Sequence, residues 1–361
     1  MNTMNAIPNE VLEAWQNRPI KTRRPAPRLV DLTVDVGDVT VPVDTGISAS
    51  DCLPMPEGYK FPTKGAAKKS AERAIHALVK GRNCFIHGMP GTGKDAIVHA
   101  FSALSRKPVL MVTFRPGTDL APWFYMRSYT AGETGWRYGA LWNALTEGVI
   151  GTDGKPRAPL ILLSDVDRAD SAQAEWFRIL TDSISGRILG PDGRMVPIFP
   201  GTQFVCTANS CGTGDSRGRM TSANPIDASI MDRLGRAIEF TYLHWDDEVQ
   251  VLREKFPLLV EKAPDVFTQL QGCCEALRKA IKNEEIYGEF THRGICDVLA
   301  EAQDRLEITG KNDKLLQAGF LAWLHRLDND NRLAAKRLID PFMKGGALTD
   351  DLIPAEDGSD A

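Results

Sequence analysis

The chain has 361 residues, of which 43% are hydrophobic and 25% are charged, and its formal net charge is −4. This length leaves room for two or three domains with an ample core, and the composition is that of a globular protein. The acidic balance argues against a protein that coats nucleic acid by bulk charge, although a local basic surface is compatible with it. No apolar run approaches the roughly 20 residues of a membrane span, and the amino terminus lacks the apolar core of a signal peptide. We therefore expect a cytoplasmic protein with no membrane segment.

Seven cysteines are scattered along the chain without a Cys-x-x-Cys pair. An odd, dispersed set is typical of a reducing cytosol and indicates neither a disulfide framework nor a zinc site. Cys84 and Cys206 lie inside apolar runs of strand length, where we expect buried free thiols.

Residues 1–65 are predicted to form an N-terminal extension with a short β segment. Pro, Lys and Arg crowd the stretch Arg18–Arg28, which indicates an extended linker. Its basic cluster is compatible with contact to nucleic acid or an acidic partner, but a solvated linker is the preferred interpretation. Apolar and polar residues alternate over Leu29–Val43, which predicts one or two strands.

Strands and helices alternate over residues 66–245, the signature of a parallel sheet wound by helices. The predicted strands are 83–87, 108–113, 159–165, 203–209 and 237–243. The predicted helices are 66–80, 95–104, 119–127, 140–147, Ser171–Ser185 and a short one that ends at Arg233. The intervening pieces are a Gly-rich polar loop over 128–138, a turn over 151–157, a hairpin over 186–199 and a loop over 210–223.

Residues 246–345 are helical in pattern and are predicted to form a second, all-α domain, followed by a flexible tail over 346–361. Within 294–306 the apolar positions fall on one helix face, namely 295, 298, 299, 302 and 306.

The stretch Gly88–Asp95 fits the phosphate-loop pattern G-x-x-x-x-G-K-[ST] at every fixed position except the last. A strand precedes it and a helix follows, so backbone N–H groups and the helix dipole are directed at a phosphate chain, and Lys94 reaches its β and γ groups. We therefore expect the chain to bind ATP. The residues predicted to contact the nucleotide are Gly88, Met89, Pro90, Gly91, Thr92, Gly93, Lys94, Asp95 and Ala96.

Hydrolysis of ATP needs a Mg²⁺ ligand set, a carboxylate that positions water, a polar sensor of the γ-phosphate and a cation. The strand ending in Ser164 and Asp165 is placed to deliver acidic and hydroxyl groups, and the strand ending in Asn209 to deliver the sensor amide. Arg233 and Arg293 are the candidate cations, with a surface or salt-bridged arginine as the alternative for each. The predicted catalytic residues are thus Lys94, Asp165, Asn209, Arg233 and Arg293.

These motifs resemble those of the AAA+ superfamily and, within it, the MoxR branch, with the nearest likeness to the ATPase subunit of aerobic cobaltochelatase (CobS). Four further segments are similar to motifs of that family: Asp38–Pro42 to a short N-terminal motif, Phe204–Asp215 to the sensor-1 strand and loop, Ile230–Arg233 to the arginine-finger segment and Thr291–Arg293 to the start of the sensor-2 helix. The likeness covers roughly residues 35–345.

The resemblance implies an AAA+ core followed by a helical lid, assembled as a hexameric ring or an open spiral. By this resemblance Arg233 reaches the ATP of the neighbouring subunit, with Arg236 as a weaker candidate, and Arg293 contacts the γ-phosphate in its own subunit. It also implies that the 186–199 hairpin is inserted in the second core helix and faces a pore. A partner with a von Willebrand-type metal-binding domain is the family expectation.

Two departures from the family pattern concern the metal site. Asp95 stands where the phosphate loop of the family has a hydroxyl. Ser164 stands where the family has an aspartate at the end of the strand that corresponds to 159–165. These positions face each other across the Mg²⁺ site of this fold, so carboxylate and hydroxyl are exchanged and the oxygen ligands and charge are conserved. We hypothesise that Asp95 binds Mg²⁺ and that Ser164 holds a metal-bound water. The rival is a decayed site that binds ATP without hydrolysis. Asp165 is one methylene shorter than the usual glutamate, which predicts slow turnover.

The favoured function is an ATP-hydrolysing ring motor that remodels a client protein or complex. The alternatives are a nucleotide-gated assembly protein with little hydrolysis, a true cobaltochelatase subunit, and a DNA-associated machine that uses Arg187, Arg194, Arg217 and Arg219. DNA is not favoured, because the overall charge is acidic. Tyr129, Trp136 and Tyr138 suit either a pore that grips a substrate or aromatic packing beneath a loop.

Overall fold

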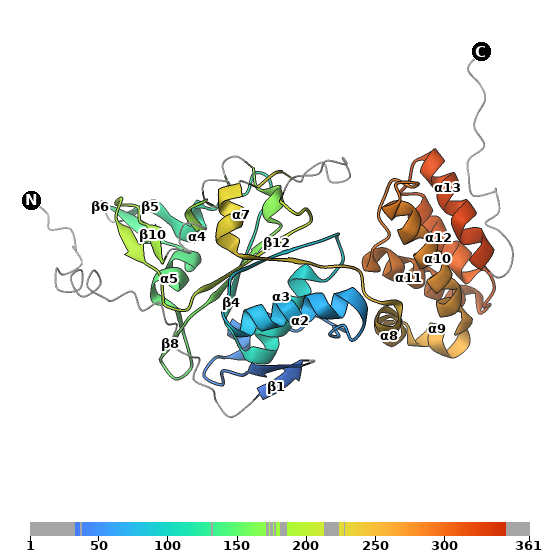
Figure 1. Ribbon diagram of the computed structural model, residues 1–361, viewed down its shortest axis with the longest axis horizontal. Helices are drawn as coiled ribbons and strands as arrows, with labels where there is room; N and C mark the ends of the chain where they lie inside the picture. Colours follow the sequence, from blue (N-terminus) through green and yellow to red (C-terminus); the bar gives the residue numbers. More distant parts are fainter. Residues whose placement is uncertain are drawn as a thin grey trace, which may run out of the picture.

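A computed structural model describes residues 33–36, 38–130, 133–170, 173, 176, 178–180, 186–212, 224–226 and 228–343. A sheet with helices on both faces forms the amino-terminal part, and a cluster of helices forms the carboxy-terminal part (Figure 1). This is the predicted fold class, a parallel sheet wound by helices followed by an all-α domain.

The central sheet has five parallel strands in the order β13-β3-β12-β9-β4. Their bounds are Cys84–His87 for β3, Val109–Thr113 for β4, Leu160–Ser164 for β9, Gln203–Ala208 for β12 and Arg236–Glu239 for β13. Every residue of β9 and β12 is buried, as expected for central strands covered on both faces. Because β12 lies between β3 and β9, the carboxyl ends of these three strands meet at one place.

Helices cover the two faces of the sheet (Figure 1). One face packs against α2 (Gly65–Val79), α3 (Lys94–Ser105) and the antiparallel pair of β1 (Thr33–Val36) and β2 (Val39–Pro42). The other packs against α4 (Ala121–Phe124), α5 (Ala140–Glu147) and α7 (Ala228–Leu234). Of the helix predicted over Ser171–Ser185, residues 173, 176 and 178–180 are helical and the rest lie outside the described residues, as do 213–223 of the predicted loop.

The predicted loop over 128–138 is wrong, as is most of the helix over 119–127. Beyond the short α4, the chain forms an antiparallel ribbon of β5 (Tyr125–Thr130) and β6 (Glu133–Tyr138). Cross-strand pairs of aromatic residues stabilise such a ribbon although its glycines and polar residues suggest a loop. A second, smaller pair of β7 (Val149–Ile150) and β8 (Pro156–Arg157) flanks the predicted turn.

The 186–199 hairpin exists, but its predicted place in the second core helix is wrong. It consists of β10 (Arg187–Leu189) and β11 (Met195–Pro197), and it directly precedes β12. The hairpin that separates two helices is instead the β5–β6 ribbon, which lies between α4 and α5. A Pro-Asp-Gly turn marks the first hairpin in the sequence, whereas no such signal marks the second.

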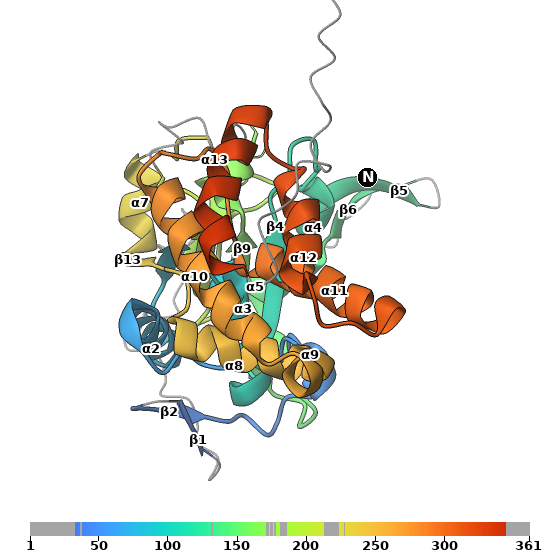
Figure 2. The ribbon, with the colours of Figure 1, turned by 90° about the vertical axis from the view of Figure 1, so that its right-hand side faces the viewer.

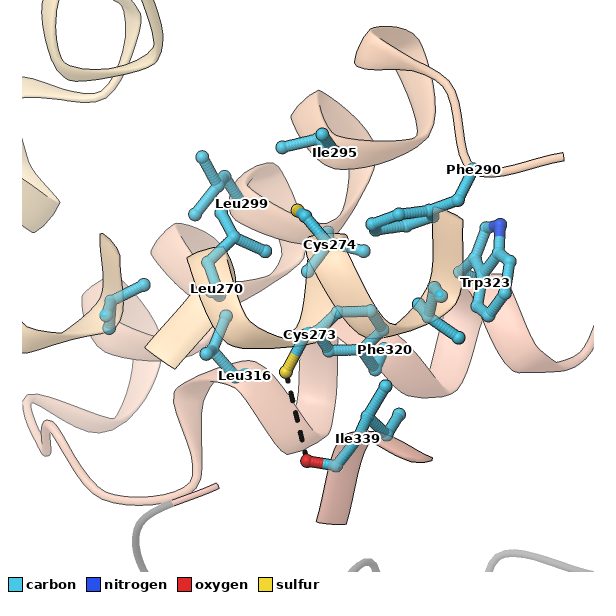
Figure 3. Packing of buried hydrophobic residues seen from close by; sticks show 14 of the residues in the cluster. Leu270, Cys273, Cys274, Phe290, Ile295, Leu299, Leu316, Phe320, Trp323 and Ile339 are labelled. Carbon is cyan, nitrogen blue, oxygen red and sulfur yellow. Dashed lines mark hydrogen bonds between the residues drawn. The ribbon is translucent and has the colours of Figure 1, made fainter. Parts of the chain in front are cut away.

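The carboxy-terminal helices have a hydrophobic core of their own. They are α8 (Trp245–Lys255), α9 (Pro257–Lys262), α10 (Asp265–Lys282), α11 (His292–Thr309), α12 (Leu315–Leu324) and α13 (Asn329–Ile339). Figure 3 shows Phe290, Phe320 and Trp323 packed together, and the Cys273 thiol donating to the Ile339 carbonyl at 3.8 Å. The predicted apolar face of residues 295–306 is buried in this core. No helix of the described residues is long and apolar enough to cross a membrane.

All seven cysteines are free thiols, and Cys84 and Cys206 are buried as predicted.

One buried carboxylate joins the helical part to the segment before α2. Asp247 of α8 accepts hydrogen bonds from the Thr63 hydroxyl at 2.5 Å and from the backbone N–H groups of Thr63 and Lys64 at 2.9 and 3.0 Å. Beside it, the Lys64 ammonium contacts Asp246 at 2.6 Å. The segment before the sheet is thus attached to the first helix after the sheet.

Helices α11 and α12 approach so closely that only glycine fits at position 319. A Cβ there would lie 2.2 Å from the Val298 carbonyl oxygen. We expect Gly319→Ala to lower the stability of the helical part by about 1–3 kcal/mol, because one helix must move. Hydrogen exchange of amides in α11 and α12 measures this.

The matched control is Gly294→Ala in α11, where the nearest atoms lie 3.7 Å from the added Cβ. That change is expected to be neutral or to stabilise by about 0.5–1 kcal/mol. Equal hydrogen-exchange protection of the α11 and α12 amides in Gly319→Ala and Gly294→Ala would contradict a close approach of the two helices at Gly319.

Candidate functional site: a phosphate loop and the ends of three strands

The phosphate loop follows β3 and turns directly into α3. Gly88 has φ +146°, and a Cβ at this position would lie 2.2 Å from the Phe240 carbonyl oxygen, so only glycine fits between β3 and the end of β13. Gly93 has φ +84° and is the N-cap of α3. The loop therefore presents the amino end of a helix to its ligand, the arrangement that binds phosphate.

Lys94 is the first residue of α3, at the end of this loop, and is almost completely buried. Its ammonium donates to the Gly88 and Met89 carbonyls at 2.7 and 3.1 Å and to the Asn209 amide oxygen at 2.9 Å. Burial lowers the pKa of Lys94, and Asp95 and Asp165 oppose that shift. The lysine thus directly joins the phosphate loop to the end of β12.

Asp95 meets hydroxyls from two neighbouring strands. Ser164, the last residue of β9, donates to one carboxylate oxygen at 2.7 Å, and Thr207 of β12 donates to the other at 2.6 Å. The two hydroxyl oxygens are 3.4 Å apart, and both side chains are fully buried. The exchanged residues Asp95 and Ser164 are therefore in direct contact, and Thr207 completes the cluster.

This cluster has the donor chemistry of a magnesium site. The described residues contain no group of three or more His, Cys, Asp or Glu side chains able to hold a metal. Mg²⁺ does not need such a group, because it is usually bound through one or two carboxylates together with substrate phosphates and waters. One carboxylate and two hydroxyls beside a phosphate loop fit that pattern.

Asp165 directly follows β9 in a strained conformation. Its φ is +54°, in the left-handed region that non-glycine residues seldom adopt and that Asp tolerates better than most. Burial raises the pKa of its carboxyl group; Arg168, 3.9 Å away, opposes the shift, and the charges of Asp95 and Asp167 reinforce it. The Asn209 amide lies 3.5 Å from the same carboxyl. A carboxyl group with a raised pKa is better matched to proton transfer at neutral pH.

Two residues of this site were not predicted from the sequence. Asp167 is buried, and one of its oxygens accepts the backbone N–H groups of Asn209 and Ser210, each at 2.9 Å, so it fixes the end of β12. Thr207 is the other. The available signal was a hydroxyl within an otherwise apolar strand, two positions before Asn209.

The structure brings together Lys94, Asp95, Ser164, Asp165 and Asn209, but it does not bring the predicted arginines to them. Arg233 is exposed in the last turn of α7, and Arg236 is aligned with Cys84, at the opposite end of β3 from the phosphate loop. Arg293 is exposed in the first turn of α11.

The start of α11 nevertheless lies against the phosphate loop. A Cβ at Gly91 would lie 3.0 Å from the Thr291 Cβ, so the residue that caps α11 is in close contact with the loop. Arg293 is therefore held two residues away from a contact with the nucleotide-binding segment.

A cavity opens beside the loop, between the sheet and the helical part. Its walls come from the segment before α2, the phosphate loop, the chain after β13 and the start of α11, and they include Tyr59, Gly91, Tyr242, Glu248 and His292. Largely apolar walls with a few polar groups are typical of sites for small molecules, and the loop at one end fits a nucleotide.

Comparison with known proteins identifies the central segment. Residues 83–234 match the family model of the AAA domain, dynein-related subfamily. This segment is therefore similar to AAA domains. AAA domains are nucleotide-binding ATPase modules, in agreement with the phosphate loop and the cavity beside it. A search of curated proteins returned no match.

Solved structures with a similar arrangement include a mutant of RuvB from Thermotoga maritima and NtrX from Brucella abortus in complex with ADP. RuvB is 14% identical, with a TM-score of 0.43 over 74% of this chain and 72% of that one. NtrX is 14% identical, with a TM-score of 0.47 over 76% of this chain and 56% of that one.

A buried charge cluster connects the helical part to the nucleotide cavity of the AAA domain. Glu248 accepts two hydrogen bonds from Arg278 at 2.7 and 2.9 Å and lies 3.0 Å from His292. The Arg278 guanidinium lies 4.3 Å from the ring centre of Tyr242, and the Cys296 sulfur lies 3.6 Å from the other His292 nitrogen. Three of these residues, Tyr242, Glu248 and His292, line the cavity.

The pKa shifts in this cluster follow from its hydrogen bonds. Burial favours the neutral form of Glu248, but hydrogen bonds from His292 and Arg278 outweigh it, so its pKa lies below the ordinary value. Burial likewise opposes charge on His292, while hydrogen bonds with Cys296 and Glu248 raise its pKa to about 9.

The shift of Glu248 predicts an acid-labile helical part. A carboxyl group whose pKa is lowered on folding stabilises the fold above its unfolded pKa and loses that contribution as pH falls through its folded pKa. Glu248→Gln is expected to cost roughly 1.5–3 kcal/mol at pH 7. It should also flatten the loss of stability on acidification below pH 5. Thermal melts between pH 3.5 and 7 test both points.

Glu301→Gln, an exposed position of α11, is the control and should match the wild type at every pH. If the wild type and Glu248→Gln lost stability equally steeply on acidification, another group would govern the acid transition.

Proposed function

We propose that this chain is a magnesium-dependent ATPase of the MoxR and CobS-like type that assembles with copies of itself and remodels a client. The observation that carries the proposal is the contact of Asp95 with the hydroxyls of Ser164 and Thr207 beside Lys94. A decayed site would lose one ligand without compensation. Here the hydroxyl and the carboxylate have changed places, and both have kept hydrogen-bonding partners.

Asp95 is the residue that would bind Mg²⁺ directly, and Ser164 would hold one of its waters. When bound, the ion neutralises charge on the β- and γ-phosphates. Thr207 acts as a positioning residue, because its hydroxyl fixes the second oxygen of Asp95. Ser164 and Thr207 are buried on central strands, so the orientation of the carboxylate is set before any ligand binds.

The chain's own residues then divide the remaining work. Lys94 contacts the phosphates, and Asn209 orients the attacking water towards the γ-phosphate. Asp165 accepts the proton of that water, a role supported by its raised pKa and by its proximity to Asn209. Asp167 acts as a positioning residue for Asn209, because its carboxylate accepts the Asn209 backbone N–H.

The cation for the developing charge comes from a neighbouring copy. Arg233 is exposed on α7, and Arg236 is aligned with the end of β3 remote from its own phosphate loop, which supports action on another subunit. Arg293 acts within its own chain, since α11 begins against the loop. A ring or open spiral supplies such head-to-tail contacts. A partner with a von Willebrand-type domain is part of the proposal only by resemblance.

Substitutions of Asp95 and Ser164, including their exchange back to the usual arrangement, test the metal site. Asp95→Ala is expected to reduce ATP hydrolysis about a hundredfold or more, because metal stabilisation of transition-state charge is worth several kcal/mol. The double variant Asp95→Ser with Ser164→Asp restores the usual arrangement and should recover much of the activity. Phosphate release and the Mg²⁺ dependence of ATP affinity are the measurements.

Thr207→Val and Thr207→Ser form a matched pair for the positioning role. Valine should raise the Mg²⁺ concentration needed for half-maximal activity, and serine should not. Hydrolysis by Asp95→Ala at the wild-type rate would rule out the exchanged site.

Mixing two inactive variants tests whether Arg233 acts on the ATP bound by a neighbouring subunit. Arg233→Ala alone is expected to lose hydrolysis by about 10³-fold or more while it still binds ATP. Mixed with Asp95→Ala, it should regain activity, because an intact ATP site then meets an intact Arg233 from its neighbour. Arg337→Ala, at an exposed arginine of α13, is the control. Failure of the mixture, with both variants in one assembly, would place Arg233 outside the site.

A further inference from the structure

The β5–β6 ribbon carries a ladder of aromatic residues on one face. Tyr125 pairs with Tyr138, Arg127 with Trp136, and Tyr129 with Thr134. Directly opposed residues share a face of an antiparallel pair, and so do alternate residues along each strand. Four aromatic rings and one arginine therefore follow one another along the same face.

This ladder starts in the core of the AAA domain and continues beyond it. At its base, the Tyr125 ring lies 5.3 Å from Trp142 and Tyr138 stacks on Trp142 at 5.5 Å. Further out, Trp136 is 39% exposed and Tyr129 is 76% exposed. Figure 2 shows the ribbon projecting from the body of the molecule. Trp136 contacts Tyr125 and Arg127 but stays partly exposed, and Tyr129 is the most exposed ring of the ladder.

A second exposed surface lies beside the ladder. The Tyr125 hydroxyl contacts the Leu189 carbonyl of β10 at 3.4 Å, which places the two hairpins together (Figure 1). On β10 and β11, Leu189 and Met195 are 41% and 48% exposed. The two hairpins thus carry five of the large hydrophobic side chains that are exposed: Tyr129, Trp136, Tyr138, Leu189 and Met195.

The charge on these hairpins is opposite in sign to that of the chain. Their exposed cations are Arg127, Arg137, Arg187 and Arg194, and their exposed carboxylates are Glu133 and Asp192. Asp192 is 3.6 Å from Arg194 and compensates it. The Arg127 guanidinium lies 5.4 Å above the Trp136 ring, on the aromatic face itself. The described surface is therefore locally basic on a chain of net charge −4.

We propose that this aromatic ribbon, the β5–β6 face of Arg127, Tyr129 and Trp136, binds single-stranded nucleic acid. Every base has a flat π-face that stacks on Trp or Tyr whatever its identity, and arginines pair with the phosphates between bases. An unfolded polypeptide offers neither a regular negative charge nor an aromatic ring at each residue. A duplex hides its base faces. The combination of aromatic rings and arginines on one face therefore favours a single strand over a duplex or an unfolded polypeptide.

The inference deepens the proposed function by naming its client, but the binding itself needs no hydrolysis. The test is fluorescence anisotropy of a labelled 20-nucleotide oligothymidylate with the full chain, with and without ATP. The double variant Tyr129→Ala with Trp136→Ala is expected to bind at least about tenfold more weakly, since two stacking platforms are lost. Tyr129→Ala alone, at a side chain outside the core, should weaken binding about fivefold or more. Tyr287→Ala, at an exposed tyrosine of the helical part, should bind as the wild type does.

Salt dependence separates the arginine contribution. Each phosphate contact to a single strand adds about −0.7 to the slope of log affinity against log salt, so Arg127→Ala should make the slope shallower and Arg337→Ala on α13 should not. The proposal is overturned if the oligonucleotide does not bind saturably, if the double variant binds it equally well, or if an unfolded polypeptide probe binds at the ribbon in its place. Loss of ATPase activity in Asp95→Ala with oligonucleotide binding intact would keep the two proposals distinct.

Discussion

The contact of Asp95 with Ser164 and Thr207 is the constraint on which the rest of the site depends. A carboxylate at the first turn of α3 would be costly beside buried strands unless both of its oxygens were hydrogen-bonded. The strands β9 and β12 supply one hydroxyl each, at 2.7 and 2.6 Å. Because those strands are neighbours in the sheet, the same geometry brings Asp165 and Asn209 beside Lys94. One hydrogen-bonded carboxylate thus positions the loop, the strand ends and the sensor together.

The helical part contacts the same cavity through buried charges. Asp247 fixes the segment before α2, and Glu248 organises Arg278 and His292 at the wall of the cavity. Both carboxylates come from the first turn of α8, immediately after the sheet ends. Glu248 lines the cavity and its neighbour Asp247 binds the segment before α2, so two adjacent residues of α8 connect the helical part to the rest of the chain.

Sequence patterns were reliable where local rules decide structure, and less so where long-range pairing does. The central strands, most of the helices and the Pro-Asp-Gly hairpin were predicted, since apolar runs and turn residues are local signals. The β5–β6 ribbon was not, because its packing joins different elements: Tyr125 contacts Trp136 across the two strands, and Tyr125 and Tyr138 contact Trp142 of α5. Its mixture of glycine and polar residues gives no strand signal. The same ribbon carries the surface that we assign to a single-stranded client.

The sequence by itself determined the phosphate loop, the identity of Asp95 and Ser164 as departures from the pattern, and the alternation of strands and helices that specifies the sheet. These features depend on residue type and spacing along the chain. Only the tertiary structure revealed that Thr207 shares Asp95 with Ser164, that Asp167 binds the backbone at Asn209, and that Glu248 faces His292. Each of these contacts joins residues more than 40 positions apart. Strand order and helix packing decide such distances, and no local pattern encodes them.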